Sequence, residues 1–207
     1  MSKIILDFGS GNTCKNKIDY IEAMYNELKK VDNNKHEIIV KWQLFTICGF
    51  NLPLAKNSFD YAYEYGKKLG YQVTASVFDK ESLDFLSKYN IPFIKLANRR
   101  DTDYLINYIP ANIPIYISKD NQNINFENKE HDITEFFCIS KYPANIKDYE
   151  DNFQLEENCY LSDHTDNFKL YKKYKPSIVE WHYKLSYSTG LDSGPFARTP
   201  EQLKEIL

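Results

Sequence analysis

Residues 159–164 (Cys-Tyr-Leu-Ser-Asp-His) and 178–182 (Ile-Val-Glu-Trp-His) are two short apolar runs, and each ends in a histidine. Their length and composition predict β-strands. Side chains two positions apart on a strand share a face, so Ser162 points with His164 and Glu180 with the histidine that ends the second run. Two imidazoles, a carboxylate and a hydroxyl can then meet where the strands end. This set predicts a divalent-metal site with an acid/base group beside it; the alternative is two unrelated, partly buried histidines.

Six more strand-like runs precede these two, and helical patterns separate several of them. The eight predicted strands are 4–8, 38–45, 72–78, 92–96, 113–118, 133–140, 159–162 and 177–183. Apolar residues recur at helical spacing over 18–28, 59–63 and 83–89, with Asp79 as a predicted N-cap and Thr199-Pro200-Glu201-Gln202 as a predicted helix start. Alternating strands and helices favour an α/β fold with a parallel sheet, and eight strands favour a closed (β/α)8 TIM barrel.

A chain of 207 residues is near the lower size limit of this barrel, so we expect a minimal version in one domain over residues 1–207. The polar, asparagine-rich stretches 119–132 and 144–157 carry no convincing helical pattern. One or two of the outer helices are therefore expected to be reduced to loops.

The bulk composition excludes several classes of protein. The formal net charge is −3 and the lysines are scattered, so no basic field favours nucleic-acid binding. No apolar window reaches membrane-spanning length, and the apolar start is too short for a signal peptide. The four cysteines form no C-x-x-C pair, which argues against a zinc ribbon. A soluble cytoplasmic protein with reduced thiols is expected, with no nucleic-acid or membrane partner.

Catalytic groups of a (β/α)8 barrel lie at the carboxyl ends of its strands. The polar residues that fall there are Asp7, Lys41, Gln43, Ser76, Lys95, Ser118, Ser140, Tyr142, Ser162, His164, Glu180 and His182. A lysine inside an apolar strand is costly to bury without an anionic partner. Lys41 and Lys95 with the serines therefore describe a pocket for a phosphate and a carboxylate. The alternative is that both lysines form structural ion pairs with acids such as Asp7 or Glu180.

The order of motifs resembles the sialic acid (N-acetylneuraminate) synthase family, whose members condense phosphoenolpyruvate with an open-chain sugar. Ser162-Asp163-His164-Thr165 is identical to the family's Ser-Asp-His-Thr, and Val179–Tyr183 resembles Ile-Glu-(Lys/Arg)-His-Phe. Further resemblances are Val40–Gln43 to Val-Lys-(Phe/His)-Gln, Ile94–Ala97 to Tyr-Lys-Ile-Ala, Cys138–Pro143 to Cys-Val-Ser-Glu-Tyr-Pro, Gly190–Asp192 to Gly-Pro-Asp, and Thr199–Leu203 to the helix start that follows.

The resemblance implies a role for each matching residue. His164 and His182 would hold a divalent ion, Mn²⁺ or Mg²⁺. The residues around phosphoenolpyruvate and the sugar would be Lys41, Gln43, Ser76, Lys95, Asn98, Ser118, Ser140 and Ser162. The catalytic groups would be Glu180, Asp7, Tyr142 and Asp192. The implied reaction joins phosphoenolpyruvate to an N-acylated aldose of the N-acetylmannosamine type and releases phosphate.

The chain also departs from the family pattern, mostly on the sugar side. The first strand reads Asp7-Phe8-Gly9 where the family has Glu-Ile-Gly followed by Asn-His, and Asn98-Arg99-Arg100 replaces Ser-Gly-Glu after Ala97. The stretch between Phe45 and Leu52 is shorter than the family's sugar-contacting loop. The resemblance does not extend to a C-terminal antifreeze-like domain, whose arginine contacts the sugar of a partner subunit. Either Arg99 or Arg100 could replace that arginine; the alternative is a solvated loop pair.

Three functional hypotheses follow. The first is a minimal synthase, which could work as a homodimer. The second is an aldol-type barrel that uses a Schiff-base lysine. The third is a non-catalytic or partner-dependent relative that binds a sugar or phosphoenolpyruvate.

Overall fold

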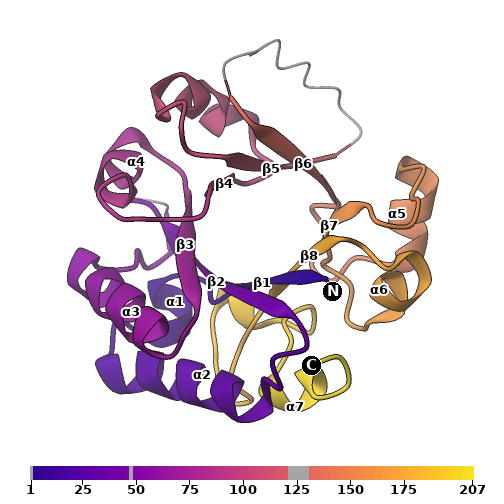
Figure 1. Ribbon diagram of the computed structural model, residues 1–207, viewed down its shortest axis with the longest axis horizontal. Coiled ribbons are helices and arrows are strands. Elements are labelled where there is room, and N and C mark those ends of the chain that lie inside the picture. The colour runs from indigo at the N-terminus through magenta and orange to yellow at the C-terminus, as the bar shows by residue number, and fades with distance from the viewer. Residues whose placement is uncertain (1, 47–48, 121–130) are drawn as a thin grey trace.

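The computed structural model describes residues 2–46, 49–120 and 131–207, and within them eight parallel strands close into a barrel in the order β1 to β8. The strands are β1 (Lys3–Asp7), β2 (Glu37–Leu44), β3 (Gln72–Val77), β4 (Ile94–Leu96), β5 (Ile115–Lys119), β6 (Ile133–Cys138), β7 (Tyr160–Ser162) and β8 (Ile178–His182). β1 pairs with both β2 and β8, which closes the sheet. The predicted TIM barrel is confirmed (Figure 1).

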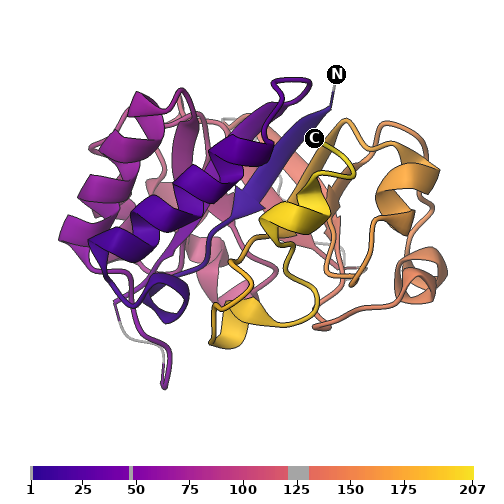
Figure 2. The ribbon, with the colours of Figure 1, turned by 90° about the horizontal axis from the view of Figure 1, so that it is seen from below.

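Helices surround the barrel on its outside (Figures 1 and 2). They are α1 (Gly11–Cys14), α2 (Ile18–Val31), α3 (Lys56–Lys68), α4 (Lys80–Leu86), α5 (Ile146–Asn152), α6 (Lys169–Tyr174) and α7 (Pro200–Leu203), with 3₁₀-helices η1 (Arg100–Tyr108) and η2 (Leu191–Ser193). Asp79 caps α4 as predicted, and Thr199 and Gln202 form the predicted capping box of α7. No helix in the described ranges is long and apolar enough to span a membrane.

The outer helices are reduced, but not everywhere in the predicted way. The connection after β4 contains the 3₁₀-helix η1 in place of an α-helix. The stretch 144–157, expected to be a loop, contains α5, which starts with a capping box between Asn145 and Asp148. This helix buries only Tyr149, so it leaves no apolar period in the sequence. Most of the expected loop 119–132 lies outside the described residues.

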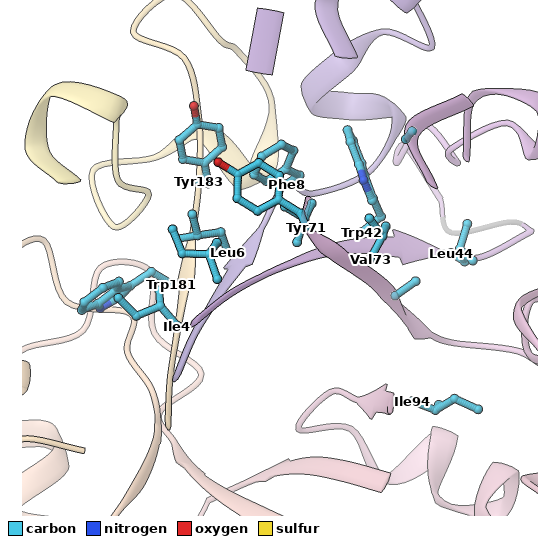
Figure 3. Close-up of a cluster of buried hydrophobic side chains, with 14 of the residues drawn as sticks. Ile4, Leu6, Phe8, Trp42, Leu44, Tyr71, Val73, Ile94, Trp181 and Tyr183 are labelled. Carbon is cyan, nitrogen blue, oxygen red and sulfur yellow. The ribbon is translucent and has the colours of Figure 1, made fainter. Parts of the chain in front are cut away.

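Strand alternation sorts the side chains into two layers. Ile4 and Leu6 on β1, and Phe8 directly after it, belong to the large core between barrel and helices, where Phe8 stacks on Tyr183 at 4.5 Å between ring centroids (Figure 3). The intervening position 5 belongs to a second, smaller core that fills the barrel interior, made of Ile5, Ile39, Phe93 and Phe136.

Residues two places further along each strand point into the same interior, closer to the carboxyl ends of the strands. There the apolar filling gives way to polar side chains, including Asp7, Lys41 and Lys95, all buried. The strand register pairs Asp7 with Lys41 on one side and with His182 on the other. The polar side chains at the strand ends therefore lie next to one another, directly above the apolar side chains that fill the barrel interior.

Candidate active site

A cavity of about 830 Å³ opens at the carboxyl ends of the strands. It is lined by every residue that the sequence analysis assigned to the site: Asp7, Lys41, Gln43, Ser76, Lys95, Asn98, Ser118, Ser140, Tyr142, Ser162, His164, Glu180, His182 and Asp192. Most come from strands; Asn98, Ser140, Tyr142, His164 and Asp192 come from segments that follow β4, β6, β7 and β8. His164, expected to end the seventh strand, lies two residues beyond it. Ser140, expected to end the sixth strand, lies two residues beyond it and is exposed.

Lys41 lies at the buried end of the cavity within a set of oxygen acceptors. Its Nζ donates to Asp7 Oδ2 at 2.6 Å and to Ser76 Oγ at 2.8 Å, and it lies 3.6 Å from Glu180 Oε1. Burial alone would lower the pKa of Lys41, but the charges of Asp7 and Glu180 raise it above its ordinary value. Lys41 is therefore held as an ammonium.

Lys95 has a weaker set of partners. Its Nζ donates to Ser118 Oγ and to the Leu96 carbonyl, and it lies 3.8 Å from Glu180 Oε2. Burial lowers the pKa of Lys95, and the charge of Glu180 offsets this only in part. Glu180 thus lies between two lysines, and its Oε2 is buried without a hydrogen bond. The structure contains the ion pairs of the alternative interpretation. Lys41 is paired with both Asp7 and Glu180, whereas Lys95 has only the share of Glu180 that Lys41 leaves, so an anionic ligand could complete the partners of Lys95.

His164 and His182 both line the cavity, and their ring centroids are 5.3 Å apart. His164 Nδ1 lies 2.7 Å from the Ile139 carbonyl, which can only accept, so this nitrogen carries the proton. Its Nε2 lone pair then points toward Ser162 Oγ, 3.4 Å away. Burial and the neighbouring His182 lower the pKa of His164 to about 3, so the ring is neutral at pH 7. His182 Nδ1 is buried without a hydrogen-bond partner.

These donors fit a divalent ion with an open coordination sphere. A neutral histidine whose other nitrogen is held by a backbone carbonyl is a typical metal ligand. Within the described residues no cluster of three or more His, Cys, Asp or Glu side chains is arranged as a metal site. Two imidazoles could therefore hold an ion only together with ligands from substrate or water.

Two carboxylates approach His182 from different segments. Asp7 Oδ2 and Asp192 Oδ1 lie 3.8 and 3.6 Å from His182 Nδ1, and Gln43 Nε2 donates to both carboxylates, at 2.9 and 3.1 Å. Burial would raise the pKa of Asp7, but Lys41, His182 and the hydrogen bonds from Lys41 and Gln43 lower it to about 2. Burial and the charge of Asp7 raise the pKa of Asp192. Of these two carboxylates, Asp192 is therefore the one that is protonated more readily.

Gly9 makes the approach of Asp192 possible. Its φ of +76° lies in the left-handed region, and a Cβ there would meet Thr13 Oγ1 at 2.3 Å and Asp192 Oδ2 at 3.0 Å.

The rim of the cavity is aromatic on one side and cationic on the other. The Tyr142 residue is about half exposed, and its ring lies 4.3 Å from the His164 ring. Asn98 Nδ2 donates to Ser140 Oγ at 3.0 Å. Arg99 lines the cavity, pairs with Asp101 through Nε and Nη2, and lies over the Phe78 ring. Both arginines are exposed, but only Arg99 lines the cavity, so of the two it is the one near a ligand bound there.

The lining residues that the sequence analysis did not assign to the site include Asn51, Phe78, Cys138 and Phe196. Cys138 shares its strand face with Phe136 and could have been found from strand alternation. Phe196 lies 5.0 Å from both the Tyr142 and His182 rings and comes from an irregular segment that carries no periodic signal.

A sequence model of the NeuB family matches residues 21–207. The chain belongs to the NeuB family. A curated relative, the N-acetylneuraminate-9-phosphate synthase of Drosophila melanogaster, is 30% identical in an alignment 108 residues long that covers 47% of this chain. The matched part is only 29% of the length of that relative.

Several solved structures share the fold. The N-acetylneuraminic acid synthetase of Leptospira borgpetersenii superposes with a TM-score of 0.76 at 17% identity, over 99% of this chain and 80% of that one. The spore coat polysaccharide biosynthesis protein SpsE of Bacillus subtilis gives a TM-score of 0.75 at 17% identity, over 99% of this chain and 65% of that one. A truncated 3-deoxy-D-arabino-heptulosonate 7-phosphate synthase from Thermotoga maritima gives 0.63 at 12% identity, over 99% of this chain and 83% of that one.

Proposed function

We propose that this NeuB-family chain has a sialic acid synthase-like role and condenses phosphoenolpyruvate with an N-acylated aldose to a nonulosonic acid and phosphate. The observation that carries the proposal is the placement of two buried lysines around Glu180, directly beside two cavity-facing histidines. Two cations suit the phosphate and carboxylate of phosphoenolpyruvate. Imidazole nitrogens suit a divalent ion at the sugar aldehyde.

The lysines would bind and orient phosphoenolpyruvate. Ser76 and Ser118 already accept hydrogen bonds from Lys41 and Lys95, so their hydroxyl protons remain available to phosphate or carboxylate oxygens. Fixed cations in a site with little water stabilise charge that develops on the phosphate as it leaves.

His164 and His182 would hold Mn²⁺ or Mg²⁺, which when bound would polarise the aldehyde oxygen as a Lewis acid. The methylene carbon of phosphoenolpyruvate forms the new bond to the aldehyde carbon. The aldehyde oxygen gains a proton, for which Asp192, with its raised pKa, is the proposed donor.

Water then adds to the phosphate-bearing carbon and gives up one proton. The bond between that carbon and the ester oxygen breaks as the new hydroxyl becomes the keto group, and the hydroxyl proton leaves with the inorganic phosphate. Glu180 Oε2 accepts no hydrogen bond in the described structure and is the proposed acceptor of the water proton. Tyr142 and Asn98 lie at the rim and would contact the sugar, and Asp7 would keep Lys41 charged and Gln43 oriented.

Phosphate release tests the proposal. The full chain is incubated with phosphoenolpyruvate, Mn²⁺ and a panel of N-acylated hexosamines, beside His182→Ala and, as a matched control, His36→Ala, whose histidine precedes β2. We expect phosphate release that depends on both the sugar and the metal. This release should be lost in His182→Ala and retained in His36→Ala. Phosphoenolpyruvate binding without release would favour the non-catalytic, partner-dependent alternative.

The lowered pKa of Lys95 favours one other function, a Schiff-base aldolase, because a neutral amine can attack a carbonyl. Borohydride reduction in the presence of a sugar or pyruvate would then add a fixed mass to the peptide that contains Lys95. The synthase proposal expects no such adduct.

A further inference from the structure

Arg198 is completely buried but does not line the cavity. Its backbone N–H donates to the His182 carbonyl at 2.7 Å, and its own carbonyl accepts from Lys184 N at 2.9 Å. An isolated parallel bridge joins it to Tyr183. The segment around Arg198 therefore extends the sheet beside the end of β8, where His182 is located.

The Arg198 side chain reaches in the opposite direction, to the loop that carries His164. Nη1 donates to the Thr165 carbonyl at 2.7 Å and to the Phe196 carbonyl at 3.0 Å, and Nη2 donates to the Asn167 carbonyl at 2.6 Å. Nη2 also lies 3.5 Å from Asp163 Oδ2. The guanidinium group is 4.9 Å from the Phe168 ring centroid.

Asp163 links this arginine to both histidine-bearing elements. Its Oδ2 accepts from Trp181 Nε1 on β8 at 2.9 Å. Its Oδ1 accepts from the Thr165 N–H and hydroxyl, at 2.8 and 2.7 Å. The residues on either side of His164 and the residue before His182 therefore belong to one buried network.

We infer that Arg198 is a positioning residue that fixes the two imidazoles relative to each other, through its backbone for His182 and through its side chain for His164. The inference rests on the proposed function in one respect only: the purpose of holding the imidazoles in place is to bind the divalent ion. Burying a guanidinium is costly unless carbonyls and a carboxylate satisfy it. Apart from the Phe196 carbonyl, these acceptors flank His164, while the Arg198 backbone pairs with the end of β8, so the arginine couples the two segments.

The shape of the side chain matters as well as its charge. A guanidinium presents a planar fork of donors in fixed directions, whereas a lysine ammonium is a single point on a flexible stem. Lysine at position 198 could keep the charge beside Asp163, but it could not reach the Thr165, Phe196 and Asn167 carbonyls together.

The test is histidine NMR on full-length protein labelled with ¹⁵N-histidine, first without metal. Arg198→Lys is compared with wild type and with Leu83→Ala, which removes core volume from α4 on another side of the barrel. The expected result is a shift or broadening of the His164 and His182 ring signals in Arg198→Lys, with His36 unchanged. In Leu83→Ala the signals of both site histidines should stay in place although stability falls.

Manganese binding, followed by electron paramagnetic resonance, gives the second measurement. For folded Arg198→Lys we expect the Mn²⁺ affinity to fall by about 10- to 100-fold, the usual effect of removing groups that orient a metal ligand. If Arg198→Lys fails to fold, Trp181→Phe replaces it. This variant removes one donor to Asp163 Oδ2 but keeps an aromatic ring, and smaller changes in the same direction are expected.

The outcomes separate this inference from the proposed function. If wild type binds no Mn²⁺, the metal part of the proposed function is wrong, while the ring signals still decide the role of Arg198. Unmoved His164 and His182 signals in the Arg198 and Trp181 variants, or equal movement in Leu83→Ala, would overturn the inference and leave Arg198 a purely structural residue.

Discussion

The Lys41 ammonium lies 2.6 Å from Asp7 Oδ2, and both side chains are almost completely buried. They are paired residues of adjacent strands, so the register of β1 on β2 brings them together. A second ion pair on the same two strands, Lys3 with Glu37 at 3.5 Å, is partly exposed at the opposite end. The two pairs therefore differ mainly in burial.

Asp7→Asn should destabilise the protein strongly, because it leaves Lys41 with a reduced set of counter-charges in a buried place. Removing one partner of a buried ion pair costs about 3–5 kcal/mol, whereas an exposed pair contributes about 0–1 kcal/mol. Urea unfolding at pH 7 of Asp7→Asn beside Glu37→Gln measures both. Equal losses in the two variants would contradict the importance of burial.

The same ion pair predicts a dependence on acid. Because the pKa of Asp7 in the folded protein is lowered to about 2, its contribution is fully present above the pKa of the unfolded chain, near 3.9. It is lost as the pH falls from about 4 through about 2. The difference in unfolding free energy between wild type and Asp7→Asn should shrink over this interval.

Lys95→Met should have a much smaller effect on stability than Lys41→Met. Burial lowers the pKa of Lys95, so its ammonium opposes folding at pH 7, whereas Lys41 is stabilised by Asp7 and Glu180. We expect a change within about 1 kcal/mol for Lys95→Met and a loss of about 3–5 kcal/mol for Lys41→Met. Calorimetric titration of the folded Lys95→Met with phosphoenolpyruvate should show affinity weakened by about 1.5–3 kcal/mol, the usual contribution of a hydrogen bond to a charged group.

Asp79→Ala should cost about 1 kcal/mol, because it removes the cap of α4. Asp79 accepts from the Ser82 N–H at 2.8 Å and from the Thr46 N–H at 2.7 Å. Burial would raise its pKa, but these hydrogen bonds lower it, so the cap contributes above the ordinary aspartate pKa and is lost as the pH falls through the folded value. Unfolding curves measured from pH 7 downward should show the difference between wild type and Asp79→Ala at pH 7, and this difference should shrink as the pH falls below the ordinary aspartate pKa. Ser87→Ala, at the other end of the same helix, is the control.

Cys138 should resist alkylation although it lines the cavity. Burial raises its pKa to about 12, and the charge of Lys95 lowers it too little to produce a thiolate at pH 8. Iodoacetamide labelling followed by peptide mass spectrometry should leave Cys138 unmodified until urea unfolds the chain. Rapid labelling of the native protein at Cys138 would show that the thiol is far more accessible than its burial indicates.

Trp181 and Arg198 illustrate what a motif does not reveal. The motif that Val179–Tyr183 resembles has lysine or arginine where this chain has Trp181. Here Trp181 donates a hydrogen bond to Asp163, and the cation beside that carboxylate is Arg198, from a segment seventeen residues later in the sequence. Nothing local in the sequence indicates that Arg198 is buried.

The sequence by itself determined the eight strands and the inward face of each, because alternation of side chains is a local property of an extended backbone. It thereby also determined which strand-borne polar residues, from Asp7 to His182, line one cavity. The tertiary structure alone decided what depends on the path of the connecting segments: the approach of Asp192 to Gln43, the helix α5 with its one buried tyrosine, and the contact of Arg198 with Asp163. Such contacts arise where irregular segments fold back over the strand ends. The path of these segments cannot be predicted from the sequence, because they carry no periodic pattern of apolar residues.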